Sequence, residues 1–93
     1  MTLTDKEYKI IAHTLGVNLE MAAKRKKYAD GVVWNNFYRN GFMACVGHDD
    51  LPLLIALRDK GLMETIGWCY IVTDLGMSVF TRQFIKIWKE RMQ

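Results

Sequence analysis

The sequence predicts a small α+β domain that is mainly helical and contains one small antiparallel β-hairpin. Residues 51–60 are rich in leucine and are followed at once by Gly61. Glycine commonly ends a helix because it adopts the left-handed backbone conformation without strain. Residues 70–80 then change from a short β-branched segment to a second helical pattern that begins at Thr73. A helix, a tight hairpin and another helix in this order place both helices on one face of the hairpin.

The N-terminal segment predicts two further helices. Thr4 and Glu7 have the three-residue spacing of a capping box, and apolar residues recur at helical spacing from there to Gly16, where we expect the first helix to end. Asn18 can cap a second, short helix that runs through about Lys27.

The middle of the chain has the least regular pattern. We expect a turn at residues 30–31, a helical turn near residues 35–39 and a short strand within residues 42–45. Residues 47–50 predict a loop whose final acids cap the next helix. Pro52 suits the first turn of that helix, where its missing N–H is not needed.

The pattern of the C-terminal segment predicts a helix with two apolar faces. One face closes the core and consists of Met77, Phe80, Phe84 and Ile87. The apolar surface is extended around the helix by Val79, Ile85, Trp88 and Met92. An exposed apolar face commonly marks an interface, and tryptophan often dominates the binding energy of one. We therefore expect a homodimer through this helix, with Trp88 as its anchor and Ile85 and Met92 beside it.

Length and composition indicate one globular domain over residues 1–93 with a modest core, which makes a partner subunit reasonable. No apolar run approaches the roughly 18 residues of a membrane-spanning helix, and the N-terminus lacks the pattern of a signal peptide. Cys45 and Cys69 lie in apolar surroundings that suit reduced, buried thiols. We expect a cytoplasmic protein that does not bind membranes.

Two motifs resemble those of winged-helix regulators. A Leu-x-x-x-Gly-Leu step begins at Leu57 and leads into the hairpin, and a Tyr-x-Val-Thr-x-x-Gly step begins at Tyr70 and leads out of it. The resemblance implies a winged-helix-like domain in which the hairpin is the wing. Gly76, the last residue of the second motif, is then the small residue that lets the final helix approach the hairpin.

A second resemblance covers residues 37–80. The Tyr38-Arg39-Asn40 step, with Phe42 and the Gly-His-Asp-Asp loop, is similar to small uncharacterised proteins of bacteriophages and prophages. It implies a location in the host cytoplasm and no known activity.

The leading functional hypothesis is a small accessory protein that acts by binding a protein, as a regulator or inhibitor of a host or phage protein. In a DNA-reading winged helix, the helix before the wing carries polar side chains for base edges. Here that helix begins after Asp49-Asp50 and is almost wholly apolar, and the wing has no Lys or Arg at its tip. The residues expected to contact the partner are Trp34, Tyr38, Asn40, Ile85, Trp88 and Met92.

The alternative hypothesis is a nucleic-acid-binding regulator that contacts duplex DNA. The net charge of +3 comes from the first half of the chain, where Lys24, Arg25, Lys26 and Lys27 form a basic run. Such a run either follows a phosphate backbone or forms the solvated face of a helix. Arg39 is the further candidate contact. The aromatic residues close to it either stack unpaired bases or form part of the core; they are Trp34, Phe37, Tyr38 and Phe42.

The sequence does not predict an enzyme. Cys45, His48 and Asp49 are close in sequence, and Cys69 or His13 could add a ligand, but the two ligand pairs typical of a zinc site are absent. No glycine-rich phosphate loop or oriented nucleophile is evident. We expect no cofactor, no metal and no catalysis.

Overall fold

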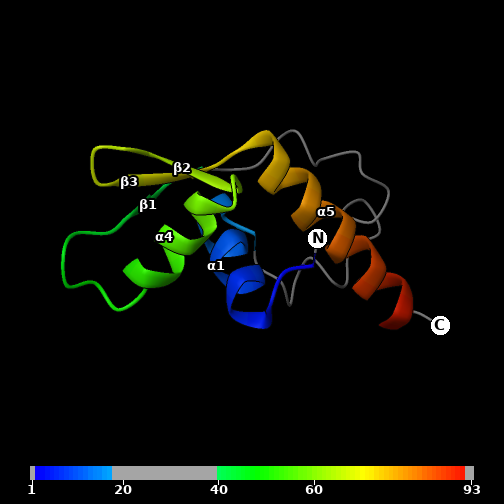
Figure 1. Ribbon diagram of the computed structural model, residues 1–93. Coiled ribbons are helices and arrows are strands. Elements are labelled where there is room, and N and C mark those ends of the chain that lie inside the picture. Colours follow the sequence, from blue (N-terminus) through cyan, green and yellow to red (C-terminus); the bar gives the residue numbers. More distant parts are fainter. Residues whose placement is uncertain (1, 18–39, 92–93) are drawn as a thin grey trace.

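The computed structural model describes residues 2–17 and 40–91, apart from the side chains of Trp88 and Arg91 (Figure 1). Its elements, labelled as in Figure 1, are α1 (Asp5–Leu15), β1 (Phe42–Met43), α4 (Leu51–Asp59), β2 (Met63–Ile66), β3 (Cys69–Val72) and α5 (Asp74–Arg91). The three strands form one antiparallel sheet. The described residues therefore form a small α+β domain, as the sequence predicts.

The sheet has the strand order β1-β3-β2, so β3 is its central strand. The hairpin pairs Met63 with Val72 at one end and Ile66 with Cys69 at the other. On its other side, β3 pairs Cys69 with Met43 of β1. The expected hairpin is confirmed, and the short strand expected within residues 42–45 is the third strand of the same sheet.

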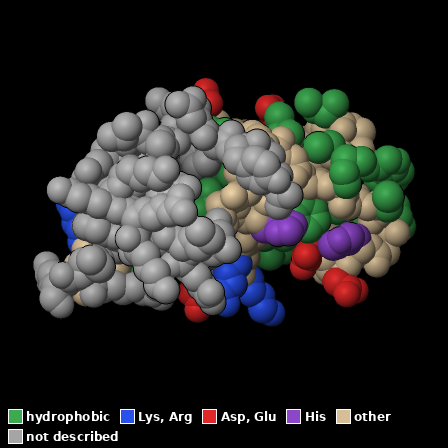
Figure 2. Space-filling model, turned by 180° about the vertical axis from the view of Figure 1, so that it is seen from behind, with side chains coloured by type: hydrophobic (Ala, Val, Ile, Leu, Met, Phe, Trp, Pro, Cys, Tyr) green, Lys and Arg blue, Asp and Glu red, His purple; other side chains and the backbone are tan. Residues whose placement is uncertain are grey.

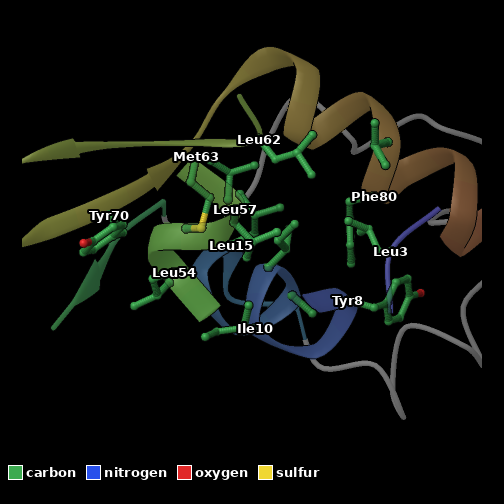
Figure 3. Close-up of a cluster of buried hydrophobic side chains, with 14 of the residues drawn as sticks. Leu3, Tyr8, Ile10, Leu15, Leu54, Leu57, Leu62, Met63, Tyr70 and Phe80 are labelled. Carbon is green, nitrogen blue, oxygen red and sulfur yellow. The ribbon is translucent and has the colours of Figure 1, made fainter. Parts of the chain in front are cut away.

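One face of this sheet forms part of the core. Side chains alternate along a strand, and Met63, Tyr70 and Val72 are buried on the inner face. Figure 1 shows α1 and α4 together on one side of the sheet, while α5 continues from the end of β3. The core unites residues of all three helices with the inner face, and Figure 3 shows many of these side chains pointing toward one another.

Helix α1 begins and ends where the sequence predicts. The Thr4 hydroxyl accepts the Glu7 N–H at 3.2 Å, and Glu7 Oε1 accepts the Thr4 N–H at 2.9 Å, which completes the capping box. At the other end Gly16 has φ +74°, and the Val17 N–H donates to the Ala12 carbonyl at 2.8 Å. This pattern is a Schellman motif, which needs the left-handed glycine.

Helix α4 differs from its prediction at one end. Pro52 lies in the first turn as expected, but Asp50 makes no capping bond with its side chain. Its backbone is already helical, with φ −88° and ψ −4°, whereas a capping residue needs an extended backbone to return its side chain to the helix. At the C-terminal end the prediction is confirmed, because Gly61 has φ +79° and the Leu62 N–H reaches the Leu57 carbonyl at 3.0 Å.

The hairpin is joined to α5 by a compact junction around Thr73. Its hydroxyl accepts the Gly76 N–H at 3.1 Å and donates to the Gly61 carbonyl at 2.7 Å. Gly76 is buried, and a Cβ atom placed there would overlap the Leu62 carbonyl oxygen and lie 2.7 Å from Cγ1 of Val72. The close approach expected at Gly76 is confirmed.

The predicted core face of α5 is also confirmed. Phe80 and Phe84 are buried, and Met77 and Ile87 pack against the core while remaining partly exposed. Val79, which the sequence places on the extended outer surface, is 5% exposed and belongs to the core. The helix therefore buries a wider face than four residues at ideal spacing would cover.

Several predictions concern residues outside the described ranges. They include the helix over residues 18–27 and the turns at residues 30–31 and 35–39. Among the helices of residues 2–17 and 40–91, none combines the length and the apolar character needed to cross a bilayer.

Candidate binding surfaces

Large apolar side chains are exposed at the turn end of the sheet. Met43 is 65% exposed, Val46 80%, Ile66 68% and Trp68 54%. We call these four residues the apolar tip. Figure 2 shows hydrophobic side chains gathered at this end of the molecule.

The register of the sheet places Met43 and Ile66 on either side of Cys69. Met43, Cys69 and Ile66 are paired across the three strands, so they form one row on the outer face. Cys69 is therefore only half-buried, and Cys45 in the loop after β1 is exposed, so the expectation of two buried thiols was wrong. The Ala44 N–H donates to the Trp68 carbonyl at 3.0 Å, which holds the chain after β1 beside the hairpin turn. Strand pairing thus gathers apolar residues that are far apart in sequence.

Trp68 lies in the turn of the hairpin. Two residues, Gly67 and Trp68, connect β2 to β3, and Gly67 has φ +61° while Trp68 does not have a positive φ. A glycine with positive φ in the first of two turn positions is typical of a type II′ turn, which matches the twist of the paired strands.

The second surface is a groove between α1 and α4, with a volume of about 610 Å³. We call it the α1–α4 groove. It is lined by Lys6, Lys9, Ile10, His13, Phe42, His48, Asp50 and Leu53. Its lining combines apolar side chains with two lysines, two imidazoles and one carboxylate.

Three rings lie in a row within this groove. The Phe42 ring centroid is 5.3 Å from that of His13 and 5.4 Å from that of His48, at interplanar angles of 66° and 78°. The Asp50 N–H donates to Nδ1 of His48 at 3.0 Å, which fixes the orientation of this imidazole. In the neutral ring, the proton then resides on Nε2.

An ion pair ties the start of α1 to the end of α4. Nζ of Lys60 lies 2.7 Å from Oε2 of Glu7, whose side chain is 4% exposed. Burial alone raises the pKa of this carboxyl, but hydrogen bonds from Lys60 and from the Thr4 backbone, with the charge of Lys60, lower it further than burial raises it. The pKa of Glu7 is therefore below its ordinary value of 4.5.

The lowered pKa predicts a pH-dependent contribution to stability. A carboxyl whose pKa is lower in the folded state stabilises the protein fully above its unfolded pKa, and this contribution is lost as the pH falls through the folded value. We expect Lys60→Gln to reduce the free energy of unfolding by about 1–2 kcal/mol at pH 7, because a buried carboxylate loses a charged donor. Urea denaturation should show this difference shrinking as the pH is lowered below 4.5.

The control for Lys60→Gln is Arg58→Gln. Arg58 and Asp59 form a pair at 3.4 Å, but both side chains are exposed. We expect this change to alter stability by no more than about 0.5 kcal/mol. Equal stability of Lys60→Gln and the parent protein at pH 7 would show that the Glu7 pair contributes nothing.

Asn40, an expected partner-contacting residue, has its side-chain amide engaged within the chain. Its Oδ1 accepts the Val72 N–H at 2.8 Å, and its Nδ2 donates to the Val72 carbonyl at 3.1 Å. The side-chain amide of Asn40 thus bonds to the backbone of β3 at a position just before β1 begins. Ile85, the other described candidate, is half-buried on α5.

The other predicted site residues are outside the description. They are Lys24, Arg25, Lys26, Lys27, Trp34, Tyr38, Arg39, Met92 and the side chain of Trp88. Their roles in partner or DNA binding stay predictions. Over the described ranges, no three His, Cys, Asp or Glu side chains are close enough together to hold a metal ion.

Neither surface was predicted as a whole. Ile66 and Trp68 flank Gly67, so the apolar character of the hairpin turn was visible in the sequence. For the groove, Lys6, Lys9 and His13 have the spacing of one helix face, which was available from the sequence.

Comparison of the chain with protein-family models, with curated proteins and with solved structures finds no match.

Proposed function

We propose that this protein is a non-enzymatic protein-binding domain with a winged-helix-like fold, and that the apolar tip is its contact surface. The observation that carries the proposal is the exposure of Met43, Ile66 and Trp68 at the turn end of the sheet, with Val46 also exposed in the loop that follows β1. Large apolar side chains contribute about 1.5–3 kcal/mol each when they become fully buried. An exposed cluster of this kind is typical of an interface.

The winged-helix-like arrangement is supported by the order of elements. In the part of the chain that the structure describes, the order is a helix, a short strand, another helix and a hairpin, and the short strand pairs with the hairpin. In that arrangement α4 precedes the wing, and Leu54 and Leu57 of α4 are buried in the core. The exposed residues of α4 are Pro52, Arg58 and Asp59, which do not form the polar row that reads base edges.

Charge at the wing also favours a protein partner. The turn between β2 and β3 contains Gly67 and Trp68, and the apolar tip contains no cation. Glu64, paired with Ile71 on the outer face of the sheet, is an acid that would repel phosphates. A phage or prophage protein that regulates or inhibits another protein fits this surface, and binding of duplex DNA through residues 24–27 stays the alternative.

The test compares variants of the apolar tip with a matched variant elsewhere. Tagged parent protein is used to capture partners from a lysate of its native cells, and the captured protein is purified so that its Kd can be measured. We expect Ile66→Glu and Trp68→Glu to weaken binding at least about tenfold, because each places a charge in an apolar interface. All variants should keep the urea midpoint of the parent protein.

Leu75→Glu is the control, because Leu75 is 51% exposed on α5 and does not belong to the apolar tip. We expect its Kd to stay within about twofold of the parent value. Equal binding by the parent protein and Trp68→Glu, or equal loss in Leu75→Glu, would exclude the apolar tip as the contact surface. Sedimentation equilibrium of the same proteins shows whether the partner is a second copy of the chain.

A further inference from the structure

The α1–α4 groove differs from the apolar tip in chemistry, so it carries a separate inference. We propose that it binds single-stranded nucleic acid, with phosphates along α1 and bases against the rings of His13, Phe42 and His48. Proteins that bind single strands combine a basic groove with aromatic side chains on which bases stack. This proposal does not depend on the protein-binding role of the apolar tip.

The cationic side of the groove is one face of α1. Its cations are Lys6 and Lys9, three positions apart on the helix. His13, four positions further, lies on the same side of the helix, and all three residues are exposed. At a rise of about 1.5 Å per residue, they extend over roughly 10 Å of α1. The two lysines supply six N–H donors, which are suited to phosphate oxygens.

The aromatic side of the groove is formed by three different elements. His13 belongs to α1, Phe42 to β1 and His48 to the loop before α4, and their ring centroids follow one another at 5.3 and 5.4 Å. Imidazole and phenyl rings both provide stacking surfaces for unpaired bases. Figure 2 shows both histidines on one face of the molecule, with lysine or arginine side chains on one side of them and acidic side chains on the other.

The position of Asp50 limits how single-stranded nucleic acid can lie in the α1–α4 groove. It is the one acid in the described lining, and it comes from the start of α4 rather than from α1. A phosphate next to Asp50 would be repelled, so the backbone of the ligand is expected to follow Lys6 and Lys9. The bases then face the rings.

The rings also favour single-stranded nucleic acid over a duplex and over an acidic peptide. In a duplex, the bases stack on each other and their faces are not available to protein rings. An acidic peptide can pair with the two lysines, but it makes no general use of three adjacent rings.

The experiment measures binding of the full chain to a fluorescent oligothymidylate of about 12 nucleotides by anisotropy, within the range of site sizes for single-strand binders. We expect the Lys6→Gln/Lys9→Gln double variant to bind about tenfold more weakly. Its slope of log K against log salt should be smaller by about 1.4, since each single-strand phosphate contact contributes about 0.7. The control is Lys86→Gln/Lys89→Gln, which removes the same charge from exposed positions of α5 and should leave both quantities unchanged.

A second pair of variants tests the rings. We expect His13→Ala/His48→Ala to weaken binding about tenfold, because base stacking on a protein ring is lost. His13→Phe/His48→Phe retains the rings and should retain binding. Urea midpoints check that each variant is folded.

Several outcomes would overturn the proposal. The first is that the parent protein does not bind the oligothymidylate at low salt. The second is that Lys86→Gln/Lys89→Gln weakens binding as much as Lys6→Gln/Lys9→Gln. The third is that a duplex or an acidic peptide binds as tightly as the oligothymidylate. Loss of binding in a Lys24→Gln/Arg25→Gln/Lys26→Gln/Lys27→Gln variant, with full binding by the groove variants, would also overturn it.

Discussion

Gly76→Ala is expected to lower the free energy of unfolding by about 2–4 kcal/mol, although alanine is the better helix former. The added methyl group would overlap the Leu62 carbonyl oxygen and approach Cγ1 of Val72 to 2.7 Å. That same carbonyl accepts the Thr73 N–H at 3.1 Å, so moving it disturbs the start of α5. The overlap therefore outweighs the gain of about 1 kcal/mol in helix propensity. Urea denaturation of the purified variant measures the difference.

Ser78→Ala is the control for this prediction. Ser78 is exposed two positions along the same helix, so its replacement tests propensity without any close contact. We expect a change within about 0.5 kcal/mol. A Gly76→Ala variant that is as stable as the parent protein would mean that α5 and the hairpin are not in such close contact.

Phe80→Ala is expected to have the largest effect of any truncation in the core, about 3–5 kcal/mol. Phe80 is fully buried, and its ring centroid is 5.0 Å from that of Tyr8 and 6.4 Å from that of Phe84. Removing the ring leaves a cavity between α1 and α5 that their backbones cannot easily fill. Because small domains are only marginally stable, urea denaturation should show a much lower midpoint or no folded baseline.

Two further variants make this prediction specific. Phe80→Leu fills most of the cavity and should cost less than Phe80→Ala. Leu75→Ala changes an exposed position of the same helix and should cost no more than about 0.5 kcal/mol. Similar losses in Phe80→Ala and Leu75→Ala would contradict the central place of Phe80 in the core.

Elements with local signals were predictable. The capping box of Thr4 and Glu7 needs only residues three positions apart, and Gly16 and Gly61 end helices through their own backbone conformation. Their bonds form within one turn of helix, so the sequence contains nearly all the information that they require. The cap expected from Asp50 was wrong because the chain enters α4 with a backbone that is already helical.

Both candidate surfaces were harder to predict because each joins residues that are distant in sequence. The apolar tip depends on the pairing of Met43 with Cys69 and of Cys69 with Ile66. The groove depends on Phe42 lying between His13 and His48. The helical spacing of Lys6, Lys9 and His13 was visible, but not what they would face.

The sequence by itself determined the α+β class, the helix ends at Gly16 and Gly61 and the hairpin, because these follow from local backbone preferences and apolar periodicity. The small residue at Gly76 was expected from the motif to which it belongs, whereas the contact that requires it, with the Leu62 carbonyl oxygen, is tertiary. Only the tertiary structure decided which apolar residues remain exposed and which polar groups find partners. Glu7 and Lys60 are 53 positions apart, and Asn40 and Val72 are 32 apart. Such contacts form only after helices and strands pack together, since their free energy depends on a three-dimensional proximity that no local pattern specifies.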